Sequence, residues 1–150
     1  MIELTCCPST LQKGFSTYSP VALKELFNSQ KVNHILPYNG MDNNETEQKE
    51  FQDNNKHMSI SGAQQKYSLV VDNGQMRLAL DQEQATLLLK TKLSEYANKE
   101  ISPANEHLTM QIASQVYNIP TAANGLCFFQ NDEPAYITRR FDIAPNGRKF

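Results

Sequence analysis

The sequence predicts an α+β fold in which an antiparallel sheet of about five strands packs against one main helix. Three observations lead to this prediction. Apolar runs flank Asp72-Asn73-Gly74, a turn sequence typical of β-hairpins. One long helical pattern begins at Ser102-Pro103, and two more strand-like runs follow it. The strands therefore come in groups instead of alternating with helices, which argues against a parallel sheet.

The first third of the chain contains one short helix and one polar stretch. Residues 1–18 are predicted to be irregular. Ser19-Pro20 then opens a helix, because serine is a favourable N-cap and proline fits the first helical position. Residues 39–57 are almost wholly polar with an acidic excess, so we expect a solvated connector with at most one helical turn. The alternative is a docking segment for a basic partner. We divide the chain into a lead-in, 1–56, and a lobe, 57–150.

Three strands are predicted before the long helix and two after it. The hairpin strands are 67–71 and 75–80. The third, 85–89, is nearly continuous in apolar residues, so we expect it to be buried on both faces, and it ends at Lys90. The last two are 125–129 and 135–138.

The long helix is predicted from its N-cap at Ser102 to about residue 116. Leu108, Ile112 and Val116 recur at a spacing of four and predict a stripe that faces the core. Glu106 lies in the first turn, beside that stripe.

Composition excludes several classes of protein. With 39% hydrophobic and 20% charged residues and a net charge of −2, the chain lacks the basic field of a nucleic-acid-binding protein. No apolar run is long enough to span a bilayer, and the N-terminus lacks a secretory signal. The three cysteines do not indicate a disulfide framework, and no metal-ligand spacing accompanies them. These features predict a cytoplasmic protein without a bound metal in this chain.

A loop of small residues precedes the first predicted strand. Ser59, Ser61, Gly62 and Ala63 are compact, so backbone N–H groups there can approach and hold an anion such as a phosphate. The stretch has one glycine, so it matches neither the dinucleotide-binding nor the Walker A pattern. By itself it also fits an ordinary turn.

This loop, Lys90 and Glu106 follow one another in an informative order. The N-terminal lobe of a protein kinase has a loop over the phosphates, a strand lysine that pairs with them, and a helix glutamate that orients the lysine. Taken singly, Lys90 also fits a strand-end lysine reaching solvent, and Glu106 also fits a partner of the helix dipole. The ordered set favours a kinase-like N-terminal lobe.

Four segments resemble a known family, the HipA-like serine/threonine kinase toxins of bacterial toxin–antitoxin systems. They are 58–66 (MSISGAQQK), 87–90 (LLLK), 103–107 (PANEH) and 136–142 (YITRRFD). The likeness is closest to the short members, often called HipT, which lack an additional N-terminal subdomain.

The resemblance implies a role for each matching residue. Lys90 and Glu106 would be catalytic, with Lys90 holding the ATP phosphates and Glu106 orienting it. Arg139 to Phe141 would form a hinge whose backbone reads adenine, although family members often carry glutamate in place of Arg139. Asp142 would lie near the ribose. The phosphate-covering loop would consist of Ser59, Ile60, Ser61, Gly62, Ala63 and Gln64, with Ser59 and Ser61 as autophosphorylation sites.

The resemblance also implies an activity. The family transfers the γ-phosphate of ATP, with Mg²⁺, to a protein serine, and an aminoacyl-tRNA synthetase is the expected target. A helix-turn-helix antitoxin is the expected partner. The family's catalytic loop and metal-binding aspartate have no counterpart after Asp142, so we expect the metal ligands outside this chain and no transfer by this chain alone. The alternative is a freestanding, non-catalytic module that docks a kinase or antitoxin through acidic residues 42–53.

Overall fold

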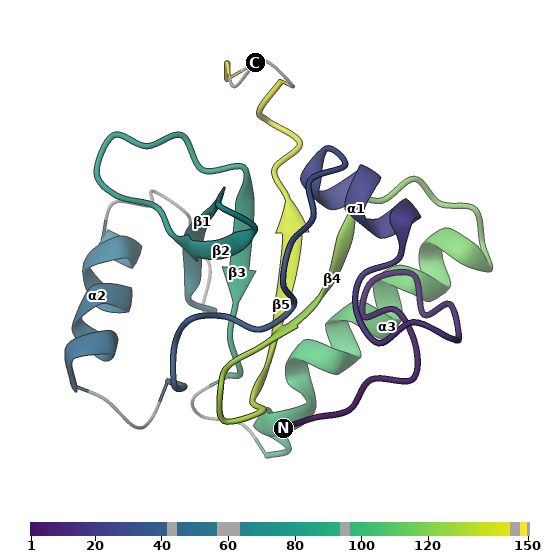
Figure 1. The fold of residues 1–150 in the computed structure, drawn as a ribbon, viewed down its shortest axis with the longest axis horizontal. Coiled ribbons are helices and arrows are strands. Elements are labelled where there is room, and N and C mark those ends of the chain that lie inside the picture. The colour runs from purple at the N-terminus through teal and green to yellow at the C-terminus, as the bar shows by residue number, and fades with distance from the viewer. Residues whose placement is uncertain (42–44, 57–63, 94–96, 145–147, 150) are drawn as a thin grey trace.

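The computed structural model describes residues 1–41, 45–56, 64–93, 97–144 and 148–149. Its centre is a five-stranded antiparallel sheet with the strand order β2-β1-β3-β5-β4 (Figure 1). The α+β class and the five strands of the prediction are thus confirmed. The strands are β1 Lys66–Asp72, β2 Gln75–Leu78, β3 Leu87–Lys90, β4 Asn124–Phe128 and β5 Pro134–Arg139.

The β1–β2 hairpin has the predicted tight turn. Asn73 and Gly74 have φ values of 49° and 75°, as a two-residue type I′ turn requires. The turn sets a register in which Leu69 pairs with Leu78 and both side chains are buried.

The sheet is curled, and the segment 33–38 contacts both of its edge strands. The N–H of Leu36 donates to the carbonyl of Phe128 on β4, at 2.7 Å. On the opposite edge, the N–H of Leu78 in β2 donates to the hydroxyl of Tyr38, at 2.9 Å. The segment therefore covers groups that would otherwise be open to pairing with another strand.

Helix α1, Pro20–Phe27, begins as predicted, since the Ser19 hydroxyl accepts the N–H of Ala22 at 3.3 Å. It covers one face of the sheet, where it contributes to a single hydrophobic core. The core also includes residues on both sides of the division at 56/57, and that division stays a prediction. Its buried members include Tyr18, Ala22, Leu26, Phe27, Leu36, Phe51, Tyr67, Leu69, Met76, Leu87, Leu89, Phe129 and Ile137.

The prediction of a solvated connector is wrong for residues 45–56, which form helix α2, Glu45–Lys56. Phe51 is 1% exposed and anchors this otherwise polar helix. Its ring lies 5.1 Å from that of Tyr38, 4.9 Å from that of Tyr67 and 6.0 Å from that of Phe129, measured between centroids. One aromatic side chain thus ties the acidic segment to the core.

Helix α3, Ser102–Gln115, follows a 3₁₀ turn, Lys99–Ile101, and packs beside β4 and β5 (Figure 1). Ser102 was predicted to cap the helix, but it is the first helical residue. Its hydroxyl donates to the carbonyl of Lys99 at 2.8 Å and accepts the N–H of Leu93 at 3.2 Å. The side chain therefore fixes the entry into the helix by bonding backward.

The predicted core stripe of α3 lies on the wrong side. Leu108, Ile112 and Val116 are 50%, 41% and 65% exposed, whereas His107 is buried. The reason is a set of hydrogen bonds on the other face, including one of 2.8 Å between His107 Nε2 and the carbonyl of Ser9. The face turned toward the sheet thus carries buried Pro103 and hydrogen-bonded His107 instead of the apolar stripe.

The burial predicted for the third strand is also wrong in part. Along β3, buried and half-buried residues alternate, so Leu87 and Leu89 enter the core while Leu88 and Lys90 lie on the opposite face. Among the described residues, no helix has the length and apolar character needed to cross a membrane.

We expect the burial of His107 to make the free energy of unfolding depend on pH. Burial lowers the pKa of His107. The pKa of a histidine in the unfolded chain is about 6.5. The stabilisation that comes from burying the neutral His107 ring is therefore fully present above that pH and is lost as the pH falls below it. Between about pH 7.5 and 5.5, the free energy of unfolding in urea should fall less for His107→Gln than for the wild type. Glutamine can donate the hydrogen bond to Ser9 but does not titrate. Equal losses would contradict this assignment.

Candidate functional site

An ion pair joins the end of β3 to the first turns of α3. Lys90 Nζ bonds Glu106 Oε1, and the two side chains are 20% and 28% exposed. Lys90 Nζ also lies 5.4 Å from the centroid of the Tyr136 ring. Burial raises the pKa of Tyr136 to about 12, and the charge of Glu106 adds to this effect. Lys90 is thus held in place by a carboxylate and an aromatic face, with part of its surface open.

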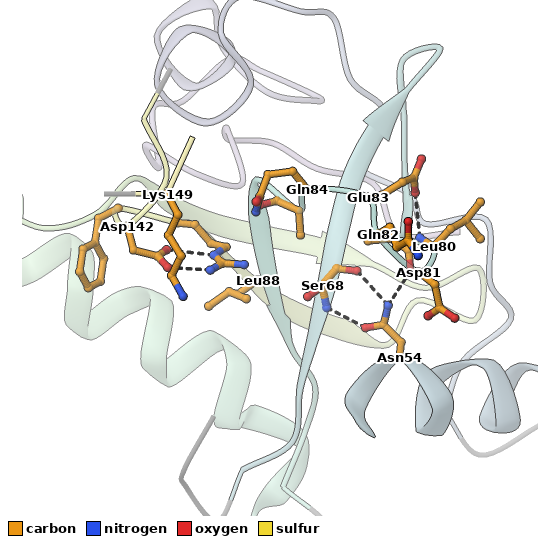
Figure 2. Close-up of a pocket in the computed structure, with 14 residues that line it drawn as sticks. Asn54, Ser68, Leu80, Asp81, Gln82, Glu83, Gln84, Leu88, Asp142 and Lys149 are labelled. Carbon is orange, nitrogen blue, oxygen red and sulfur yellow. Dashed lines mark hydrogen bonds and ion pairs between the residues drawn. The ribbon is translucent and has the colours of Figure 1, made fainter. Parts of the chain in front are cut away.

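A pocket of about 760 Å³ opens on the same face of the sheet (Figure 2). Leu88 lines the pocket. Leu88 lies two residues before Lys90, so the two side chains share one face of β3. Ser68 on β1 pairs with Leu88 and adds a hydroxyl. The lining residues are Asn54, Ser68, Ala79, Leu80, Asp81, Gln82, Glu83, Gln84, Ala85, Leu88, Arg140, Phe141, Asp142 and Lys149.

One wall of the pocket follows β5 and carries both charge and apolar surface. Arg140 Nε and Nη2 donate to Asp142 Oδ1 and Oδ2, at 2.9 and 2.6 Å. The Arg140 guanidinium lowers the pKa of Asp142, so the carboxylate is charged at neutral pH. Phe141, between them, is 83% exposed. This wall offers an apolar ring and a carboxylate that can accept hydrogen bonds from a ligand's hydroxyl groups.

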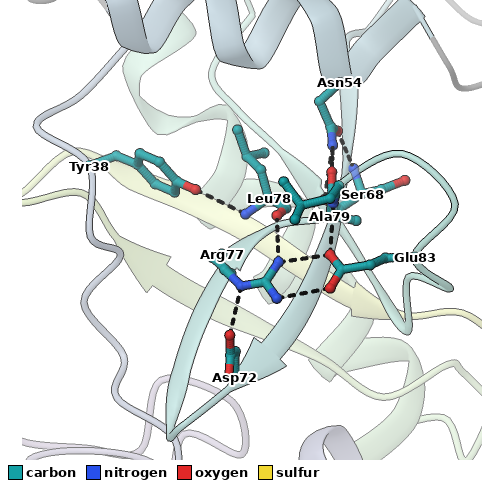
Figure 3. Close-up of polar contacts among 9 residues, drawn as sticks. Tyr38, Asn54, Ser68, Asp72, Arg77, Leu78, Ala79 and Glu83 are labelled. Carbon is teal, nitrogen blue, oxygen red and sulfur yellow. Dashed lines mark hydrogen bonds and ion pairs between the residues drawn. The ribbon is translucent and has the colours of Figure 1, made fainter.

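The opposite wall is fixed by side-chain hydrogen bonds to the hairpin (Figure 3). Asn54 of α2 accepts the N–H of Ser68 at 2.8 Å and donates to the carbonyl of Ala79 at 2.9 Å. Arg77 Nη1 and Nη2 donate to Glu83 at 2.8 and 2.9 Å, and these bonds lower the pKa of Glu83 to about 2. The end of α2 and the β2–β3 turn are therefore held at the pocket.

The structure brings together some of the predicted site residues. Lys90 and Glu106 are paired, and Phe141 and Asp142 line the pocket. Gln64 Nε2 donates to the carbonyl of Thr91, next to Lys90, at 3.1 Å. Ser59, Ile60, Ser61, Gly62 and Ala63 lie outside the described residues.

Arg139 points elsewhere. Its Nη1 donates to the carbonyl of Glu25 in α1 at 2.9 Å, and its N–H donates to the carbonyl of Ala123 at 2.8 Å. Of the predicted hinge, Arg140 and Phe141 are the residues that line the pocket.

Several lining residues were missed by sequence reasoning. Leu88 was open to prediction, since strand alternation places it on the same face as Lys90. Arg140 and Asp142 lay within the predicted hinge and ribose site, but the ion pair between them was not predicted, since a spacing of two residues is a weak signal. Asn54 and Ser68 lie 14 positions apart, and only the packing of α2 against β1 brings them together.

Metal ligands are not clustered in the described part of the chain. No group of three or more histidine, cysteine, aspartate or glutamate side chains there can hold a metal ion. Cys6 is half-buried and Cys7 and Cys127 are buried, all as free thiols.

A family model described as the HipA-like C-terminal domain matches residues 58–149, which include the sheet, α3 and the Lys90–Glu106 pair. No curated protein matches this chain.

Proposed function

Because the chain belongs to the HipA-like C-terminal domain family, we propose that it is the ATP-binding N-terminal lobe of a serine/threonine protein kinase of a bacterial toxin–antitoxin system. The observation that carries the proposal is the Lys90–Glu106 ion pair on the face of β3 that also lines the pocket. Phosphoryl transfer is catalysed mainly by positioning and charge neutralisation, and a lysine oriented by a carboxylate supplies both.

The arrangement supports a direction for the bound nucleotide. The base occupies the pocket between Leu88 and Phe141, with the ribose hydroxyls near Asp142. Lys90 lies about 7 Å further along β3, since alternate residues of a strand are that far apart. The triphosphate then runs toward Lys90, and the family resemblance assigns the loop that covers it to Ser59–Gln64.

The rest of the activity follows from the family resemblance. With Mg²⁺ bound by ligands outside this chain, the complete kinase transfers the γ-phosphate to a protein serine, on a target such as an aminoacyl-tRNA synthetase. A helix-turn-helix antitoxin restrains it in the cytoplasm. Phosphate on Ser59 or Ser61 would add a charge of about −1.5 to −2 beside the triphosphate and weaken ATP binding.

The test is nucleotide binding by calorimetry, with variants of the pocket. Leu88→Glu places a carboxylate under the base and beside the phosphates, so we expect at least about tenfold weaker ATP binding. Val21→Glu is the matched control, because Val21 is 51% exposed on α1 and lies outside this pocket. Wild-type protein that binds no ATP would overturn the proposal and leave the docking module as the alternative.

A further inference from the structure

Lys92 lies just beyond β3 and joins the sheet to the entry of α3. Its Nζ lies 3.2 Å from Oε2 of Glu133, the residue before β5, and 3.7 Å from Oε2 of Glu100, in the 3₁₀ turn before α3. Because Lys90 pairs with Tyr136 in the β3–β5 ladder, the end of β3 and the start of β5 meet at one end of the sheet, where α3 also begins (Figure 1). One ammonium group thus contacts both elements that start there.

The ion pair between Lys92 and Glu133 is largely withdrawn from water. The two side chains are 13% and 8% exposed. Taking both charges out of water costs about as much as their attraction returns, so a buried ion pair is a poor way to gain stability. The second carboxylate oxygen, Glu133 Oε1, is buried and has no hydrogen-bond partner in the described part of the chain, which adds to the cost. What such a pair can supply instead is a fixed position for the segments that it joins.

The position of Lys92 affects α3 through the next residue. The N–H of Leu93 donates to Ser102 Oγ at 3.2 Å, and Ser102 is the first residue of α3. Glu106 lies four residues later, about 6 Å along the helix axis, and its carboxylate bonds Lys90. A shift of the helix entry would therefore move the Glu106 carboxylate away from Lys90.

We propose that Lys92 and Glu133 are positioning residues for phosphoryl transfer: Glu133 holds Lys92, and Lys92 holds the entry of α3 so that Glu106 meets Lys90. The inference rests on the proposed function, because it assigns to these two residues an effect on the same site. Neither of them lines the pocket. Misplacing a catalytic group by about 1 Å can lower a rate by up to about 100-fold, so a pair outside the pocket can affect the rate strongly.

The double variant Lys92→Met/Glu133→Gln of the complete kinase tests the proposal. It removes both charges of the pair together, so no buried charge is left unpaired and the urea midpoint should stay close to that of the wild type. We nevertheless expect kcat to fall about tenfold. Asp132→Asn is the matched control, because it removes a carboxylate one residue from Glu133 that pairs with the N-terminus, and its kcat should be unchanged. A wild-type kcat in the double variant would overturn the proposal.

Combination with Glu106→Gln shows whether the pair acts through Glu106. If it does, adding Lys92→Met/Glu133→Gln to Glu106→Gln should lower kcat by less than about twofold further, since the contact that the pair supports is already lost. Losses in kcat that multiply would mean that the pair acts on the fold in general, and they would contradict the assigned role.

Hydrogen exchange of the complete kinase gives a measurement that needs no ATP. In the Lys92→Met/Glu133→Gln variant, the backbone amides of residues 99–107 should exchange about threefold faster or more, because the entry of α3 has lost an anchor. Asp132→Asn should leave their exchange unchanged. A wild-type kinase that binds no ATP would remove the proposed function, and exchange alone would then decide the inference. Equal exchange in the double variant and the wild type would show that the pair does not anchor α3.

Discussion

Replacing Lys90 with methionine is expected to lower phosphoryl transfer by the complete kinase about 100-fold or more, and to weaken ATP binding with it. Methionine keeps the length of the side chain but removes the charge that would meet the phosphates. Glu106→Gln should have a smaller effect, since Glu106 acts by holding Lys90. Labelled ATP measures the transfer, calorimetry measures the affinity, and growth after expression reports toxicity.

A double variant separates this role from a structural one. Lys90→Met leaves Glu106 without its partner in a site where it is 28% exposed, which should cost about 1–2 kcal/mol of unfolding free energy. Lys90→Met/Glu106→Gln removes both charges, so most of that stability should return. ATP binding and transfer should stay low in the double variant. Transfer that recovers together with stability would mean that the pair only supports the fold.

Local patterns were sufficient to predict the elements that depend on a few neighbouring residues. The Asp72-Asn73-Gly74 turn and the Ser19-Pro20 helix start each follow from backbone chemistry within four residues. Predicting the Lys90–Glu106 pair required information beyond neighbouring residues, namely a strand end followed by a helix start in the order known for kinase lobes. Its pairing appears in the structure, while its catalytic role stays a prediction.

Features that depend on distant segments could not be predicted in the same way. The spacing of Leu108 and Ile112 correctly indicated one side of a helix, but it could not show that Ser9, 98 residues before His107, accepts a hydrogen bond from the other side. Periodicity identifies an apolar face without saying what covers it. The pocket likewise depends on Asn54, which contacts β1 from helix α2. Composition predicted that this segment would be a solvated connector.

Substitution of Phe51 tests whether α2 is a packed helix or a solvated connector. Phe51→Ala should lower the free energy of unfolding by about 3–5 kcal/mol, because it removes a fully buried ring and leaves a cavity among Tyr38, Tyr67 and Phe129. Phe141→Ala is the same change at a ring that is 83% exposed, and it should cost less than about 0.5 kcal/mol.

Urea unfolding of the two variants beside the wild type measures the difference. In Phe51→Ala, α2 also loses its only fully buried side chain among those the structure describes for this helix. Asn54 is then left as its main contact with the hairpin, so limited proteolysis should cut within 45–56 sooner than in the wild type. A cost below about 1 kcal/mol for Phe51→Ala would mean that α2 rests on the sheet without stabilising it, as a solvated connector would.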